Sequence, residues 1–222
     1  MIVDFYFDYL SPYAYLAATE IPDLCARHGA ELRLRPVLFA GLLDHWGQRG
    51  PAEIRPKAMH TIRDVLRRAL LRGTTCSMPK HHPFNPLSAL RVSLAEVAGD
   101  NQARVMNAIF EMGWARGGDL GNPDEIRAAL DAANLDGAGL LGLAENTKSK
   151  RALRRETDEA IARGVFGVPT MIAGEEFFWG YDQLRFLELF LEGKDPLAGF
   201  DWDSSDFAGP SAWRRGISRH GE

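Results

Sequence analysis

The sequence has few cysteines, and neither is placed for a redox-active pair or a metal site. Cys25 and Cys76 form no Cys-x-x-Cys motif, so we expect two free thiols in a reducing compartment rather than a structural disulfide. The 6 histidines show none of the ligand spacings that zinc sites use. We therefore predict no bound metal.

Long apolar runs and an excess of positive charge are also lacking. No run approaches the roughly eighteen apolar residues of a membrane span, and residues 1–5 lack the basic start of a signal peptide. The chain carries 30 acidic and 26 basic residues, a net charge of −4, which gives no overall attraction to nucleic acid or anionic membranes. We expect a cytoplasmic protein that binds neither. The locally clustered Arg63, Arg67, Arg68 and Arg72 are expected to form a solvated helix face.

The periodicity of the apolar residues changes twice along the chain. It indicates a strand, then a helix that Pro22 should kink or break, then a second strand, over residues 2–8, 12–28 and 31–39. A helical period follows, with helices expected near residues 58–72, 86–97, 102–114, 122–133 and 146–163. Two short strands joined by a tight turn and a last helix are expected at residues 170–173, 176–179 and 181–191.

This order of elements predicts an α/β protein with a thioredoxin-like arrangement, βαβ then ββα, and an all-helical domain inserted after the second strand. The length of 222 residues fits one domain with an insertion. We expect the thioredoxin-like domain to comprise residues 1–41 and 164–193, the inserted domain residues 42–163, and an irregular tail residues 194–222.

A strand-to-helix junction at residues 5–16 carries the first candidate functional group. Ser11 precedes Pro12, which indicates a helix N-cap with proline at the first helical position; alone, it indicates only a capped helix. In a thioredoxin-like fold this helix end lies beside the loop before the third strand, here residues 166–170. Pro169 in that loop can be cis, which exposes the backbone of Val168 to a ligand, or trans at the start of an edge strand.

Four motifs together resemble the 2-hydroxychromene-2-carboxylate isomerase family, which is grouped with kappa-class glutathione transferases and, more distantly, with DsbA-like oxidoreductases. The motifs are Phe7-Asp8 through Ser11-Pro12-Tyr13 and Tyr15-Leu16-Ala17, His82-Pro83-Phe84-Asn85-Pro86, Phe166-Gly167-Val168-Pro169-Thr170, and Trp179-Gly180-Tyr181-Asp182. The resemblance covers about residues 1–192.

The resemblance implies glutathione as the cofactor. Ser11 and Ala14 stand where DsbA-like proteins have their two cysteines, so the thiol is implied to come from glutathione, and Ser11 to donate a hydrogen bond to its thiolate beside the helix N-terminus. Val168 is implied to pair its backbone with the cysteinyl part. The γ-glutamyl end is implied to lie on Trp179, Gly180, Tyr181 and Asp182, with Asp182 on the ammonium group; a first-turn acid that stabilises its helix is the alternative for Asp182.

The resemblance also implies the substrate, a small aromatic carboxylate. The implied reaction is the cis-trans isomerisation between 2-hydroxychromene-2-carboxylate and trans-o-hydroxybenzylidenepyruvate in naphthalene-type degradation. Asn85 is implied to face the substrate, and the candidates for its carboxylate, or else for a solvated surface, are Lys57, His81 and His82.

One segment departs from the family pattern. Gln48 and Arg49 stand where the family commonly has Asn and Lys, so we expect a changed grip on the carboxylate, in a region to which Asp44 and Glu53 add negative charge. A kappa-class-like glutathione transferase and a non-catalytic thioredoxin-fold binding module are the alternative functions. The resemblance leaves a homodimer open.

Overall fold

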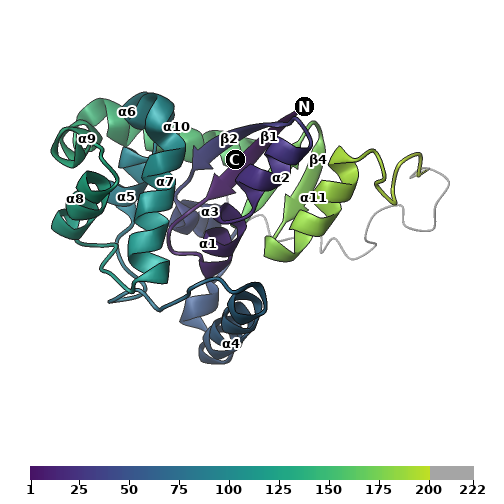
Figure 1. Ribbon diagram of the computed structural model, residues 1–222, viewed down its shortest axis with the longest axis horizontal. Helices are drawn as coiled ribbons and strands as arrows, with labels where there is room; N and C mark the ends of the chain where they lie inside the picture. The colour runs from purple at the N-terminus through teal and green to yellow at the C-terminus, as the bar shows by residue number, and fades with distance from the viewer. Residues whose placement is uncertain (201–222) are drawn as a thin grey trace.

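A mixed four-stranded sheet lies at the centre of the computed structural model, which describes residues 1–200 (Figure 1). Its strand order is β2-β1-β3-β4, with β1 (Ile2–Phe7), β2 (Glu31–Pro36), β3 (Thr170–Ala173) and β4 (Glu176–Trp179). β1 pairs with β2 in parallel and with β3 in antiparallel fashion, and β3 pairs with β4 in antiparallel fashion. The predicted thioredoxin-like fold class is confirmed.

Helices and short helical turns make up most of the remaining chain. The α-helices are α1 (Pro12–Ala18), α2 (Ile21–Arg27), α3 (Phe39–His45), α4 (Arg55–Arg72), α5 (Leu87–Val92), α6 (Ala95–Ala98), α7 (Gln102–Phe110), α8 (Pro123–Ala132), α9 (Gly137–Ala144), α10 (Thr147–Ala162) and α11 (Leu184–Leu191). The short turns are η1 (Pro51–Glu53), η2 (Gly99–Asn101), the π-helical η3 (Glu111–Ala115) and η4 (Tyr181–Gln183). Most of the predicted tail, residues 194–222, lies outside the described residues.

The central strand β1 is covered on both faces. Phe5 and Phe7 belong to the larger core cluster together with residues of α1 and α7, whereas Tyr6 belongs to a second cluster with residues of α3 and α10. Because helices cover both faces, even the polar positions of the alternating pattern lose contact with water. Tyr6 and Asp8 are both fully buried.

The helix predicted for residues 12–28 is two helices, α1 and α2. The chain breaks at Thr19 and Glu20, immediately before α2, and Pro22 occupies the first turn of α2, where it needs no backbone donor. The predicted break is confirmed.

The strand predicted to reach residue 39 ends at Pro36, and α3 was not predicted as a separate helix. Val37 N–H still bonds to the Phe7 carbonyl, but the next residues leave the sheet. Phe39 N–H donates to the Asp8 carboxylate, at 2.8 Å, at the position where α3 begins. The alternating pattern could not reveal this change from strand to helix, because an apolar residue at position 39 fits both the strand period and the helix period.

Two predicted helices of the central block are shorter than expected, and α9 was not predicted. The one expected over residues 86–97 is split into α5 and α6 at Ser93, whose hydroxyl donates to the Ala89 carbonyl at 2.8 Å and pairs with the hydroxyl of Tyr9 at 2.6 Å. The one expected over residues 102–114 passes into the π-helical turn η3. There Gly113 leaves space for the Leu120 side chain, which a Cβ atom would overlap.

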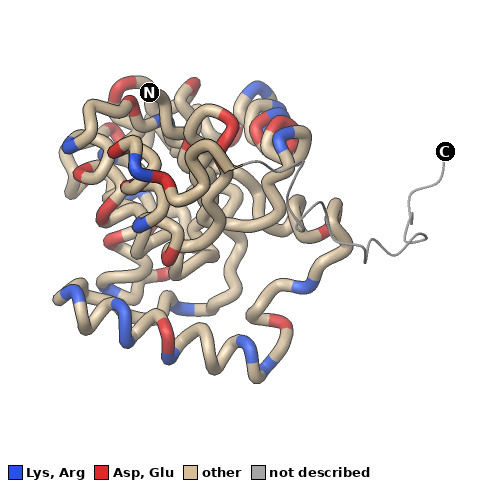
Figure 2. Tube along the Cα trace, turned by 90° about the vertical axis from the view of Figure 1, so that its right-hand side faces the viewer, with Lys and Arg blue, Asp and Glu red and all other residues tan. Residues whose placement is uncertain are grey.

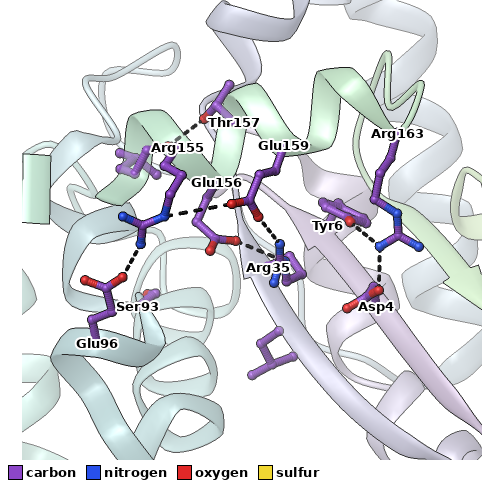
Figure 3. A network of polar contacts seen from close by, with 12 residues as sticks. Asp4, Tyr6, Arg35, Ser93, Glu96, Arg155, Glu156, Thr157, Glu159 and Arg163 are labelled. Carbon is purple, nitrogen blue, oxygen red and sulfur yellow. Dashed lines mark hydrogen bonds and ion pairs between the residues drawn. The ribbon is translucent and has the colours of Figure 1, made fainter. Parts of the chain in front are cut away.

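Helix α10 is fastened across the sheet by ion pairs (Figure 3). Arg35 on β2 lies 3.0 Å from a carboxylate oxygen of Glu156 and 2.8 Å from one of Glu159. Arg163, just after α10, pairs with Asp4 on β1 at 2.6 Å. Helix α10 therefore contacts the strands directly, and the predicted boundary between an inserted domain and the thioredoxin-like domain at residue 163 stays a prediction.

No helix within residues 1–200 combines the length and the apolar character that crossing a membrane requires.

Candidate functional site

Ser11 occupies the corner between β1 and α1 and joins the two ends of the fold. Its Oγ accepts a hydrogen bond from Ala14 N–H at 3.1 Å, as an N-cap does, and donates one to the Val168 carbonyl at 3.2 Å. Ser11 is only 7% exposed. The structure thus places side by side the two positions that the sequence motifs suggested, 157 residues apart in the chain.

The loop that leads into Ser11 is held by the helical part of the chain. Trp114 Nε1 donates to the Tyr9 carbonyl at 2.8 Å, and His82 Nε2 donates to the Leu10 carbonyl at 3.0 Å. The His82 ring also packs edge-on against Trp114, at 5.5 Å between ring centroids. His82, predicted as a substrate ligand, therefore positions the loop before Ser11, and Trp114 is a contributor that the sequence motifs did not reveal.

Asp8 lies beneath the same loop without contact to water. Its two carboxylate oxygens accept hydrogen bonds from Leu10 N–H at 3.0 Å and Phe39 N–H at 2.8 Å. Burial raises the pKa of Asp8 to about 7, although the backbone donors act in the opposite direction. The sequence signal for this buried carboxylate was weak. It consisted of an acid at the end of an otherwise apolar strand, and the alternating pattern placed Asp8 on the polar side of that strand.

The loop before β3 presents the backbone of Val168 beside Ser11. The Val168–Pro169 peptide bond is cis. Val168 N–H donates to no group among the described residues, whereas the Val168 carbonyl accepts from Ser11. Gly180 N–H donates to the Pro169 carbonyl at 2.9 Å, which joins the Trp179–Asp182 motif to this loop.

Trp179 forms a wall at this loop. Its indole lies against the backbone of Gly167, where a Cβ atom would come within 2.6 Å of Nε1, and its ring meets that of Phe166 at 4.8 Å between centroids. Trp179 remains 52% exposed. The motifs Phe166-Gly167 and Trp179-Gly180 therefore pack directly against each other.

Tyr181 has a packing role that the motif did not indicate. Its side chain is nearly buried, its hydroxyl donates to the Glu20 carboxylate, and the Arg68 guanidinium lies over its ring at 5.4 Å from the centroid. Burial, and next the hydrogen bond to Glu20, raise the pKa of Tyr181 to about 12. The tyrosine side chain thus links η4 to α2 and α4, and only its backbone remains a candidate for ligand binding.

Asp182 lies in a groove of about 410 Å³ between α2, α4 and α11. Arg68 and Arg72 of α4 line the same groove. Arg68 Nε bonds to Asp64 at 2.6 Å, and Arg72 Nε lies 2.7 Å from Glu20. Arg72 is exposed, as the predicted solvated face requires, and Arg68 is half-buried. Both arginines also pair with acidic residues.

The remaining predicted substrate residues lie on the surface and make no contact with Ser11. Gln48 and Lys57 are exposed, and no hydrogen bond or ion pair joins their side chains to any residue within 1–200. Arg49 lies 3.8 Å from Glu53. The Asn85 side-chain oxygen accepts from Leu87 N–H at 3.1 Å at the start of α5.

His81 and the potential metal ligands lie apart from this site. The His81 side chain is exposed, with Nε2 3.9 Å from a carboxylate oxygen of Asp119. Within residues 1–200 one group of side chains has its ligand atoms close enough for a metal, namely His28, Glu188 and Glu192. Glu188 already pairs with Arg27 and Arg185, each at 3.0 Å.

Comparisons with known proteins place this geometry in context. Residues 2–192 match the family model of the DsbA-like thioredoxin domain. The chain is 30% identical over 192 residues to 2-hydroxychromene-2-carboxylate isomerase of Sphingobium xenophagum, covering 85% of this chain and 97% of that one. It is 25% identical over 207 residues to glutathione S-transferase kappa 1 of Rattus norvegicus, covering 87% and 92%. A solved 2-hydroxychromene-2-carboxylate isomerase superposes with a TM-score of 0.80 at 28% identity, covering 87% and 95%.

Proposed function

Since the chain belongs to the DsbA-like thioredoxin family, in the group that contains the 2-hydroxychromene-2-carboxylate isomerases, we propose that it is a glutathione-dependent cis-trans isomerase of aromatic carboxylates. The proposed reaction interconverts 2-hydroxychromene-2-carboxylate and trans-o-hydroxybenzylidenepyruvate. The observation that carries the proposal is the contact of Ser11 Oγ with the backbone of Val168 at 3.2 Å, because it sets a hydroxyl donor, a helix N-terminus and a free backbone N–H around one point. We also propose a cytoplasmic location, as the two free cysteines suggest.

The residues around Ser11 fit glutathione. Val168 N–H has no partner within the described residues, so it is left as a donor for an extended peptide. The exposed Trp179 indole offers an apolar wall next to it. Asp182 supplies a negative charge for the γ-glutamyl ammonium, and the first N–H groups of η4 suit its carboxylate.

Glutathione, when bound, supplies a thiolate nucleophile that can add to a conjugated double bond and leave it again unchanged. Ser11 is proposed to stabilise that anion. Its hydroxyl proton now points to the Val168 carbonyl at 3.2 Å, a long hydrogen bond, and rotation about the Cβ–Oγ bond redirects the proton to a sulfur beside the N-terminus of α1. A hydrogen bond to a charged group contributes about 1.5 to 3 kcal/mol, equivalent to about one to two units of thiol pKa.

The substrate carboxylate is proposed to bind on the side of Ser11 that faces residues 82–85, away from Val168. Asn85 and His82 come from the segment that carries the His82 contact to Leu10, which supports a position near the reacting atoms. Gln48, Arg49 and Lys57 are proposed as the outer, more adaptable contacts because their side chains are exposed. His82 then has two tasks. Nε2 holds the loop and the ring packs on Phe84 and Trp114, which leaves Nδ1, without a hydrogen bond inside residues 1–200, as the atom proposed to face the substrate.

Substitution Ser11→Ala tests the proposal. We expect turnover to fall by at least about tenfold, as the loss of a 1.5 to 3 kcal/mol bond to the thiolate predicts. The folded state should lose only about 1 kcal/mol, because one helix cap is removed. The measurement is glutathione-dependent isomerisation followed by absorbance, together with urea unfolding.

A matched control is Asn122→Ala. Asn122 caps α8 by accepting from Asp124 N–H at 2.9 Å, so this variant should lose a similar amount of stability and keep its turnover. Full activity of Ser11→Ala would refute the proposed role of the hydroxyl.

A kappa-class-like glutathione transferase is the second candidate, favoured by the similarity to the rat kappa enzyme. The two reactions differ in the fate of glutathione. A time course in which glutathione falls in proportion to product would establish the transferase, and a constant glutathione concentration the isomerase. Calorimetry separates both from a non-catalytic binding module, for which we expect no heat of binding at millimolar glutathione.

A further inference from the structure

The groove between α2, α4 and α11 contains two opposite charges that form no ion pair with each other. Arg68 of α4 and Asp182 of η4 both line this groove of about 410 Å³. They are near enough to interact electrostatically, because the hydrogen bond to Asp64 raises the pKa of Arg68 and the charge of Asp182 adds to this effect. Arg68 nevertheless pairs with Asp64 and not with Asp182. A ligand with one charge of each sign can therefore lie between them.

Arg68 is held in place from two sides. Its Nε donates to Asp64 at 2.6 Å, and its guanidinium lies over the ring of Tyr181, 5.4 Å from the centroid. The two Nη atoms make no hydrogen bond within residues 1–200. Arginine binds a carboxylate through two parallel N–H groups, so the free edge of this guanidinium is a fixed donor pair for such a group.

Tyr13 connects Arg68 to the Ser11 corner. Tyr13 lies in the first turn of α1, two residues after Ser11, and its hydroxyl donates at 2.8 Å to the same Asp64 oxygen that Arg68 contacts. Figure 2 shows basic positions spaced along α4, the helix at the lower edge, and Asp64 is the one acid of that helix. Asp64 therefore sets the position of one arginine of α4 relative to the helix N-terminus at which the thiolate is proposed to bind.

Asp182 supplies the negative charge of the groove. Its side chain is exposed, and Oδ1 lies 2.7 Å from the position that a Cβ atom of Gly180 would occupy, so the glycine leaves the space that this carboxylate uses. Oδ2 accepts a hydrogen bond of only 3.4 Å from Gln183 Nε2. No cation within residues 1–200 pairs with Asp182, which leaves its carboxylate available to an ammonium group.

This pair of charges suits an α-amino-acid head group, which carries an ammonium and a carboxylate on one carbon atom. We propose that Arg68 binds the α-carboxylate of a γ-glutamyl group whose ammonium lies on Asp182, so that the protein selects thiols in which this head group is free. The inference rests on the proposed glutathione site and adds Arg68 to it as a residue that determines specificity. A carboxylate has two acceptor oxygens, so Arg68 and the N–H groups of η4 can hold it together.

Calorimetry of the full-length chain with matched ligands tests this assignment. The probes are glutathione, γ-aminobutyryl-cysteinylglycine, which lacks the α-carboxylate, and glutaryl-cysteinylglycine, which lacks the amino group. In Arg68→Gln we expect the affinity for glutathione to fall at least about tenfold, whereas the analogue without the carboxylate should bind the variant and the parent protein equally. Asp182→Asn should weaken glutathione in the same way and leave the affinity for the analogue without the amino group unchanged.

Arg72→Gln and Asp23→Asn are the matched controls, because both residues line the same groove and Arg72 lies against Glu20 instead, at 2.7 Å. Both variants should keep the affinity of the parent protein for glutathione within about twofold. Arg68→Lys keeps the charge without the fork and should show the pattern of Arg68→Gln with a smaller loss.

Two results would overturn the assignment of Arg68 alone. One is an unchanged affinity of Arg68→Gln for glutathione, and the other is an equal loss for glutathione and for the analogue without the carboxylate, which a general disturbance of the groove would cause. If the parent protein bound none of the three ligands, the proposed function would fall together with this assignment.

Discussion

Asp8 is an acidic residue in a fully buried position. Its raised pKa should make the free energy of unfolding depend on pH. Its pKa is raised from 3.8 to about 7 by burial. Between these values the folded chain keeps the proton and the unfolded chain has released it, so the free energy of unfolding should fall as pH rises from about 4 to about 7. Three pKa units correspond to about 4 kcal/mol at most.

The substitution Asp8→Asn should remove this pH dependence. Its amide keeps one acceptor oxygen but turns an NH2 group toward either Leu10 N–H or Phe39 N–H, so the variant should also be less stable by about 1 to 3 kcal/mol at neutral pH. Urea unfolding at several pH values between 4.5 and 7.5 measures both effects. Asp158→Asn, at an exposed position of α10, should keep the slope of the parent protein; a steep slope in Asp8→Asn would contradict the assignment.

Gly167 is the second residue with a specific expectation. A methyl group there would fall 2.6 Å from Trp179 Nε1, so Gly167→Ala should displace the indole from the loop that presents Val168. We expect glutathione affinity, measured by calorimetry, to fall about tenfold or more. Gly142→Ala is the matched control, because nothing lies within 4 Å of its Cβ position; equal affinities in the two variants would show that the indole wall is dispensable.

At the residue scale, the motifs predicted which residues lie together, but not which partners their side chains have. Ser11 and Val168 were paired from the order of elements and the family resemblance, and the structure confirms that they meet. Tyr181 could not be assigned from its motif, because the burial of its side chain depends on Glu20 and Arg68, two residues on other helices. Partners on other helices cannot be predicted from the local motif.

At the scale of elements, the sequence predicted the strands well and the ends of helices less well. β3 and β4 agree with the predicted residues 170–173 and 176–179, since short apolar runs flank a turn at Gly174. Breaks at Ser93 and after Pro36 were missed because tertiary hydrogen bonds from Tyr9 and to Asp8 cause them. Elements that end for local reasons were predictable, and those that end for long-range reasons were not.

At the scale of the whole molecule, one core joins the sheet to the helical insertion. Phe110 of α7 meets Tyr9 at 4.6 Å and Phe7 at 5.8 Å between ring centroids, and Trp114 holds the loop before Ser11. Because the larger core cluster spans the sheet and the inserted helices, and the second cluster joins β1 to α3 and α10, we expect a single unfolding transition despite a length at which intermediates are common. Far-ultraviolet and near-ultraviolet circular dichroism in urea should give coincident curves; two separate transitions would show that the insertion is an independent domain.

The strand order has a consequence for how the protein is made. β1 is synthesised before its antiparallel neighbour β3, which begins only at Thr170. The Val168 backbone that contacts Ser11 is made just before β3. A ribosome adding about 5 to 20 residues per second leaves one edge of this apolar strand without its final partner for roughly ten to thirty seconds. The nascent chain therefore carries an exposed apolar edge between the synthesis of β1 and that of β3. Chaperone binding, or early folding of the central helices against Phe7 and Tyr9, would protect that edge.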